Sequence, residues 1–168
     1  MTKRAQLLID QLELIQHPEG GYFKETHRSV GKIPQNSLPD LFNGDRNYYT
    51  SIYFLLTSDD FSAFHKINQE ETWYFHEGAP IKIHQISPSG EYSFVMLGNN
   101  VLKGQQFQHT VPREYWFAAT VEQKDSYSLV GCAVAPGFDF DDFTLAKRNE
   151  LIALFPEHEK MITELTLS

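Results

Sequence analysis

The chain has 168 residues, is 41% hydrophobic and contains 13 Phe, 8 Tyr and 2 Trp, a composition typical of a globular protein with a substantial core. Its formal net charge of −8, with acidic and basic residues interspersed, argues against a nucleic-acid partner. No run reaches the roughly 18 consecutive apolar residues of a membrane span and no secretory signal opens the chain, so we expect a cytoplasmic protein with no membrane partner.

The first residues predict an amphipathic helix over residues 3–15. Apolar residues recur there at helical spacing: Ala5, Leu8, Leu12 and Ile15. We expect the helix to stop before His17-Pro18, because proline disfavours helical geometry in the residue that precedes it. A strand is expected from Tyr22 to His27, after the glycines at 20 and 21.

Residues 28–47 are rich in Pro, Gly, Asn and Asp and predict a long surface excursion. Short segments rich in β-branched and aromatic residues follow, separated by turn residues. Eight strands are predicted: 48–57, 62–67, 72–76, 81–87, 92–97, 105–110, 115–121 and 127–135.

Short strands without alternating helices indicate an all-β sandwich, barrel or jelly roll. A helical segment is predicted over about residues 142–163, and we interpret Asp139, Asp141 and Asp142 as structural residues at its N-terminus. The whole chain, 1–168, is therefore predicted to be one domain, with its barrel over about residues 22–138. Cys132 is the one cysteine, and its apolar surroundings predict a core residue.

The segment from Phe64 to Gly78 carries the most specific chemistry. A strand ends near His65, a polar turn follows, and the next strand starts with Glu71. If these strands pair, an imidazole and a carboxylate share one buried site that suits general acid–base work or a metal.

This segment resembles the first cupin motif, Gly-x5-His-x-His-x3-4-Glu-x6-Gly, through His65, Glu71 and Gly78. The motif's second His is Ile67 here. In the second cupin motif the ligand His is replaced by Phe117, so two of the four usual metal ligands are present.

Longer stretches resemble the cupin 5 family. They are residues 17–26 (HPEGGYFKET), 51–56 (SIYFLL), 64–73 and 135–143 (APGFDFDDF). The resemblance implies a cupin jelly-roll (double-stranded β-helix) barrel, here with an N-terminal helix and C-terminal helices. It also implies a homodimer, and no settled activity for the family as a whole.

Metal binding is disfavoured, because a transition-metal site normally needs three or four ligands and Ile67 and Phe117 cannot coordinate one. His76, His84 and His109 hold no cupin ligand position, and His76 has the opposite strand parity to Glu71. We therefore predict no cofactor.

The remaining site predictions concern a ligand pocket. Trp73 and Phe75 share strand parity with Glu71, and Phe117 holds an interior motif position. Tyr53 combines an aromatic ring with a polar group, and Glu25 and Thr26 lie where a strand end reaches the pocket mouth.

We predict a small-molecule-binding protein with His65 and Glu71 as its catalytic pair, and three activities stay open. The first is a metal-independent isomerase or epimerase of a sugar-like or cyclic carbonyl substrate. The second is a non-catalytic ligand binder or sensor, and the third is a metal-dependent oxygenase.

Overall fold

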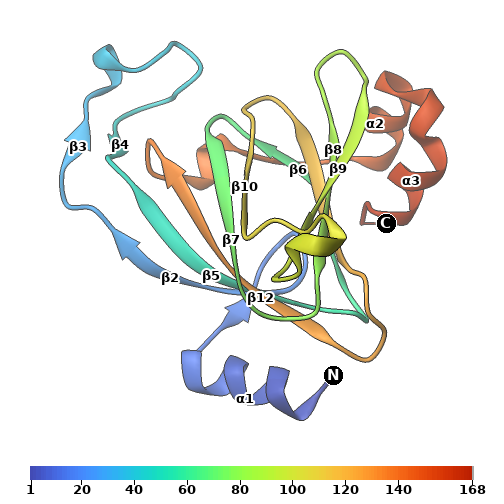
Figure 1. The fold of residues 1–168 in the computed structure, drawn as a ribbon. Helices are drawn as coiled ribbons and strands as arrows, with labels where there is room; N and C mark the ends of the chain where they lie inside the picture. Colours follow the sequence, from blue (N-terminus) through green and yellow to red (C-terminus); the bar gives the residue numbers. More distant parts are fainter. Residues whose placement is uncertain (168) are drawn as a thin grey trace.

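A computed structural model describes residues 1–167 of the chain. Two antiparallel sheets face each other, and helices lie at the two ends of the chain (Figure 1). Sheet one has six strands: β1 (Ile15–Gln16), β2 (Tyr22–Arg28), β5 (Thr50–Thr57), β12 (Tyr127–Ala135), β7 (Glu70–Gly78) and β10 (Gln108–Val111). Sheet two has five strands: β13 (Phe143–Leu145), β6 (Phe61–Ile67), β11 (Trp116–Val121), β8 (Ile81–Ile86) and β9 (Tyr92–Leu97). The predicted all-β jelly roll is confirmed.

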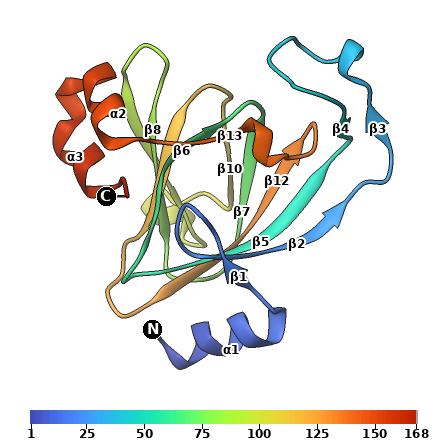
Figure 2. The same cartoon turned by 180° about the vertical axis from the view of Figure 1, so that it is seen from behind.

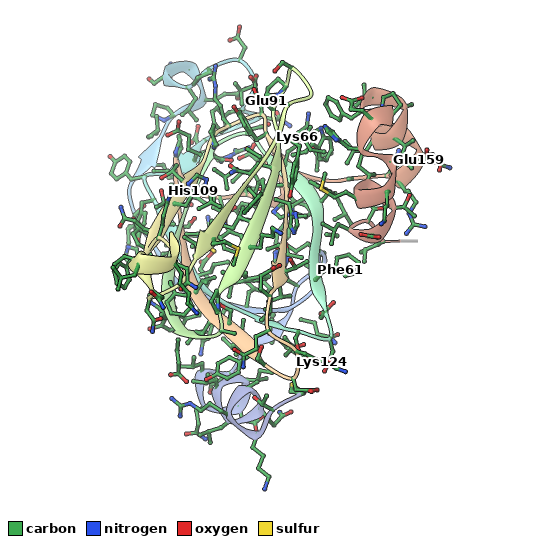
Figure 3. All side chains as sticks on the ribbon, turned by 45° about the vertical axis from the view of Figure 1, so that its right-hand side comes forward. Phe61, Lys66, Glu91, His109, Lys124 and Glu159 are labelled. Atoms are coloured by element: carbon green, nitrogen blue, oxygen red, sulfur yellow. The ribbon has the colours of Figure 1, made fainter. Side chains whose placement is uncertain are left out.

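The main core lies between the sheets, because alternate residues of each strand point inward. Phe54 and Leu56 of β5 meet Ile81 and Ile83 of β8 there, whereas Leu55 faces outward to α1 (Lys3–Leu12). Figure 3 shows side chains filling the space between the sheets.

Helices cover the outer faces of both sheets. Ala5, Leu8 and Ile9 of α1 pack under sheet one against Leu55 and Leu129. On sheet two, α2 (Arg148–Leu154) and α3 (Glu159–Glu164) bury Leu151 and Ile162 against Phe64 and Ile86 (Figure 2). Within residues 1–167, no helix combines the length and the apolar character that crossing a membrane requires.

The N-terminal helix is shorter than the predicted 3–15. Thr2 caps its start by accepting a hydrogen bond from the Ala5 N–H, and the helix ends at Leu12. Glu13 takes the left-handed conformation, and the Leu14 N–H donates to the Ile9 carbonyl. This turn frees Ile15 to pair with Phe23 in sheet one.

The C-terminal segment also departs from the prediction. Residues 143–145 are not helical, because they pair with β6 as the edge strand β13. The Asp139 side chain caps a short 3₁₀ helix at Phe140–Asp142, and the first α-helix of this region begins only at Arg148.

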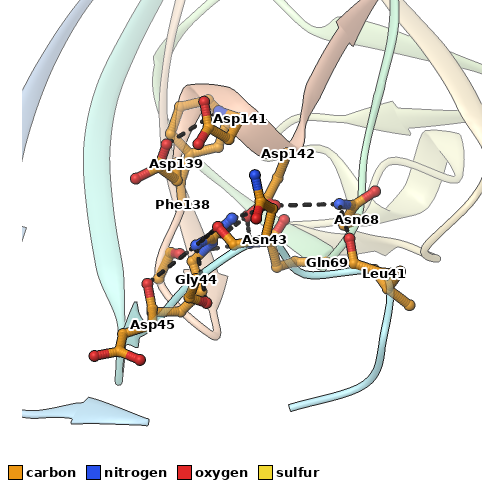
Figure 4. A network of polar contacts seen from close by, with 12 residues as sticks. Leu41, Asn43, Gly44, Asp45, Asn68, Gln69, Phe138, Asp139, Asp141 and Asp142 are labelled. Carbon is orange, nitrogen blue, oxygen red and sulfur yellow. Dashed lines mark hydrogen bonds and ion pairs between the residues drawn. The ribbon is translucent and has the colours of Figure 1, made fainter. Parts of the chain in front are cut away.

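The excursion over residues 28–47 is tied to the barrel by a buried ion pair. It contains a small hairpin of β3 (Lys32–Ile33) and β4 (Arg46–Asn47) and a 3₁₀ turn. Nε and Nη2 of Arg46 each lie 2.7 Å from a carboxylate oxygen of Asp142. Asn68 and Gln69 donate to the same carboxylate, so Asp142 holds three segments together (Figure 4).

Candidate functional site

A cavity of about 180 Å³ lies between the two sheets. This volume corresponds to roughly six water molecules, less than the roughly 300–1,000 Å³ of drug-sized ligand sites. Its lining includes the acid–base residues His17, Glu19, His65 and Glu71. The enclosed part of this cavity suits a small ring.

The loop between α1 and β2 brings Glu19 into the cavity. Gly20 and Gly21 adopt positive φ angles, at +110° and +71°, which favour glycine. A side chain at position 20 would collide with the Phe61 carbonyl, and the Gly21 N–H donates to the Asp60 carboxylate. This turn holds the Glu19 side chain against β6, where it is buried.

His65 and Glu19 are direct neighbours. Nε2 of His65 lies 3.2 Å from Oε2 of Glu19, and Nδ1 of His65 lies 2.7 Å from the Ala63 carbonyl. The other Glu19 oxygen accepts a hydrogen bond from the Ser62 hydroxyl at 2.8 Å. Burial lowers the pKa of His65 to about 3 and raises that of Glu19 well above its ordinary value, an effect that the nearby Glu71 strengthens.

Glu71 enters the cavity from sheet one. Burial raises its pKa to about 7, and a hydrogen bond with the Cys132 thiol partly opposes the rise. Burial also raises the pKa of Cys132, which is consistent with the predicted core cysteine, although its side chain also lines the cavity. A carboxyl group with a pKa near neutrality can exchange a proton at physiological pH.

The strands of His65 and Glu71 do not pair with each other, so the pairing considered from the sequence is wrong. The β6 strand pairs with β11 and β13 in sheet two, whereas β7 pairs with β12 and β10 in sheet one. The turn between β6 and β7 therefore crosses from one sheet to the other. His65 and Glu71 line the same cavity from opposite sheets.

Aromatic side chains form the remaining walls. They are Phe23, Phe54, Trp73, Phe138, Phe140 and Phe143. The ring of His17 is stacked on that of Phe140 and meets the Phe23 ring edge-on, with centroids 6.1 and 4.6 Å apart. The Trp73 indole N–H is buried and has no hydrogen-bond partner within residues 1–167. Flat apolar walls suit a planar or ring-shaped ligand.

Arg28 and Glu25 line the cavity as an ion pair. Nε and Nη2 of Arg28 donate to the Glu25 carboxylate, and Nη1 donates to the Asn47 side chain and the Phe138 carbonyl. Most of the guanidinium donors are thereby occupied, which makes Arg28 a poor anion receptor.

Four predicted pocket residues lie outside the cavity lining. Tyr53 is on the outer face of β5, beside His76 and the cluster around α1, since Ile52 and Phe54 point inward. Thr26 is exposed and bonds Ser51. Phe75 and Phe117 belong to the main core, where the Phe117 ring centroid lies 4.0 Å from that of His65.

His17 and Glu19 were not predicted as site residues, and Asp139 was assigned a structural role only. Asp139 does cap a 3₁₀ turn, and it also lines the cavity. The available signal was the pair of titratable residues around Pro18, followed by two glycines. Such a loop has no periodicity, so its docking site on β6 could not be predicted.

The donor set does not fit a cupin metal site. Ile67 and Phe117 are apolar, Nε2 of His65 faces Glu19, and its Nδ1 bonds the Ala63 carbonyl. His84 and His109 bond Tyr92, Thr120 and Gln85 and are absent from the cavity lining. Within residues 1–167, no three His, Cys, Asp or Glu side chains are grouped as metal ligands.

Solved structures match this fold over nearly its whole length. A hypothetical protein from Leishmania major has a TM-score of 0.89 and 36% identity, covering 98% of this chain and 99% of that chain. Protein SO0799 from Shewanella oneidensis has a TM-score of 0.88 and 37% identity, with 99% of each chain covered. Oxalate decarboxylase from Bacillus subtilis shares the fold alone, with a TM-score of 0.53 and 13% identity over 89% of this chain and 36% of that one.

Sequence comparison points to the same family. Protein YML079W of Saccharomyces cerevisiae is 33% identical over 151 residues, which are 84% of this chain and 75% of the yeast protein. The family model described as cupin superfamily (DUF985) matches residues 6–146. The chain therefore belongs to the cupin 5 family of the cupin superfamily.

Proposed function

We propose that this protein binds a small uncharged ring compound in the cavity and moves a proton on it without a metal. The reaction class is isomerisation or epimerisation of a sugar-like or cyclic carbonyl compound. The observation that carries this proposal is the arrangement of Glu71 and His65, which line one small aromatic-walled cavity from opposite sheets.

The chemistry needs a base on one side of the substrate and a polarising group on the other. In the proposed step, the Glu71 carboxylate takes a proton from the carbon next to the carbonyl. The electron pair of the broken C–H bond moves towards the carbonyl oxygen, which the group on the His65 side protonates. The protonated Glu71 then gives its proton to the neighbouring carbon, or to the other face of the same carbon once the intermediate has turned in the cavity, while an enol hydroxyl returns a proton to the group on the His65 side.

The size and charge of the cavity favour an uncharged substrate. Glu25, Glu71 and Asp139 line it, and the cation among the lining residues, Arg28, is already bonded to Glu25. A carboxylate or phosphate group would be repelled by these acids, whereas an uncharged hydroxyl or carbonyl group would not.

Hydrogen exchange tests the proposal without knowledge of the product. Monosaccharides and cyclic hydroxyketones are first screened by thermal shift. Each ligand found is incubated with the protein in D₂O, and NMR follows the carbon-bound proton next to the carbonyl. We expect this proton to be exchanged for deuterium.

Glu71→Gln should reduce the exchange rate at least about 100-fold, because the amide cannot act as a base. It should weaken binding by no more than about 1.5–3 kcal/mol, the value of a charge-assisted hydrogen bond. Glu70→Gln is the matched control, since Glu70 is the exposed neighbour on the same strand. Binding without any exchange would identify a non-catalytic ligand binder instead.

A further inference from the structure

The hydrogen bonds of His65 determine which of its ring nitrogens carries a proton. Nδ1 lies 2.7 Å from the Ala63 carbonyl oxygen, which can only accept. Nδ1 therefore holds the hydrogen of the neutral ring, and Nε2 presents a lone pair. The single proton of neutral His65 is thus committed to the backbone, and the ring has no other proton to offer a substrate.

The lone pair of Nε2 faces Oε2 of Glu19 at 3.2 Å. An ionised carboxylate has only lone pairs, so a hydrogen bond here requires one further proton between the two atoms. The other Glu19 oxygen already accepts the Ser62 hydroxyl. The additional proton belongs either to Oε2, giving a neutral acid, or to Nε2, giving an imidazolium.

His17 indicates which of the two atoms carries the proton. The Glu19 backbone N–H donates to Nδ1 of His17 at 3.3 Å, so this nitrogen is also an acceptor. It lies 3.3 Å from the same Oε2. His17 therefore offers no donor to Oε2, so an ionised carboxylate would lack a hydrogen bond on that side, whereas a carboxylic O–H needs only Nε2 of His65 as its acceptor.

The surroundings oppose a charged pair. The side chains of Glu19 and His65 are 7% and 3% exposed, and the Phe117 ring packs on the imidazole. The other titratable groups near the pair are Glu71 from β7, Cys132 from β12 and His17 from the loop. Burial and the Glu71 charge raise the pKa of Glu19, with the Ser62 hydrogen bond opposing, and burial lowers the pKa of His65 to about 3.

We propose that Glu19 is a neutral carboxylic acid that donates its Oε2 proton to Nε2 of His65, and that this acid is the proton donor of the site opposite Glu71. The second half of this inference rests on the proposed function. In the balanced step, Glu71 takes the carbon-bound proton while the carbonyl oxygen takes the Glu19 proton. The substrate becomes a neutral enediol, and the single negative charge passes from Glu71 to Glu19. His65 then positions the acid and is not itself the donor.

Nitrogen NMR of the wild-type full-length chain tests the protonation state without any substrate. With ring signals assigned, we expect His65 at neutral pH to be protonated at Nδ1 and unprotonated at Nε2. In D₂O at a pH well above the pKa of Glu71, where that residue is ionised, infrared spectra should show a carboxylic-acid C=O band that disappears in Glu19→Gln and persists in Glu70→Gln. A His65 protonated at Nε2, with or without Nδ1, would overturn the proposal, and this measurement needs no variant to fold.

Two variants test the role of the acid. The amide of Glu19→Gln can donate to His65 and accept from Ser62, so the His65 tautomer and the melting temperature should be retained while deuterium exchange falls at least 100-fold. Glu19→Ala should keep the tautomer but lower the melting temperature, because Nε2 and the Ser62 hydroxyl lose their partner. Unchanged exchange in Glu19→Gln would remove Glu19 from the catalytic step. The proposed function would fail separately if no ligand exchanged its carbon-bound proton for deuterium in the presence of the wild-type protein.

Discussion

At the scale of single residues, the site depends on carboxyl groups kept away from water. Glu71 is buried in the folded chain, where its pKa rises to about 7 from 4.5. Folding therefore favours its neutral form. The free-energy cost of burying its charge is absent below pH 4.5, grows between pH 4.5 and 7, and reaches about 3 kcal/mol above pH 7.

Glu71→Gln removes this cost, and the variant should gain stability relative to the wild type as the pH rises. The difference in free energy of unfolding should change by about 3 kcal/mol in favour of the variant between pH 4.5 and 8, because only the wild type must bury a charge. Urea denaturation of the variant and the wild type at several pH values measures this difference in free energy of unfolding. Glu70→Gln should show no such trend, and a pH-independent difference for Glu71→Gln would contradict the expectation.

At the scale of elements, the excursion over residues 28–47 depends on the Arg46–Asp142 pair. Arg46→Met should lower the free energy of unfolding by about 3–5 kcal/mol, because the Asp142 carboxylate would stay buried without its cation. Chemical denaturation measures the loss. Arg4→Met is the matched control, since Arg4 also binds a carboxylate through Nε and Nη2, that of Glu77, but on the surface. An equal loss in both variants would contradict the role of burial.

The packing of α1 on sheet one offers a second test at this scale. Leu8 is 9% exposed and contacts the sheet, whereas its neighbour Leu7 is 47% exposed. Leu8→Ala should lower the free energy of unfolding by about 2–4 kcal/mol, because it leaves a cavity under the helix. Leu7→Ala should cost much less, because no buried contact is lost. Thermal melts of the two variants compare them directly, and similar losses would mean that α1 does not pack through this face.

At the scale of the whole molecule, we propose that the protein is a homodimer. The strand β2 offers a segment for such pairing. In the described part of the chain, β1 pairs only with Tyr22 and Phe23, so the outer edge of β2 is open beyond them. An open strand edge can pair with a second chain. Light scattering of the full-length protein at micromolar concentration should give twice the mass of the chain, and a monomer would contradict the proposal.

The sequence by itself determined the longer strands and the direction of many of their side chains. Tyr92–Leu97 and Tyr127–Ala135 were predicted to the residue, and the alternation along β7 correctly placed Glu71 and Trp73 inward and His76 outward. These features depend on local sterics and on the two-residue period of a strand, which a short window of sequence contains.

Only the tertiary structure decided which residues meet. It put His65 and Glu71 on opposite sheets, turned Tyr53 outward, and paired Arg46 with Asp142 across 96 positions. It also brought Glu19 from a loop to His65 and Ser62, more than 40 positions away. No local pattern contains these contacts, because they depend on how strands cross between sheets and where a glycine turn docks. The protonation state of the site follows from them, since burial and lone-pair contacts decide which group holds the proton.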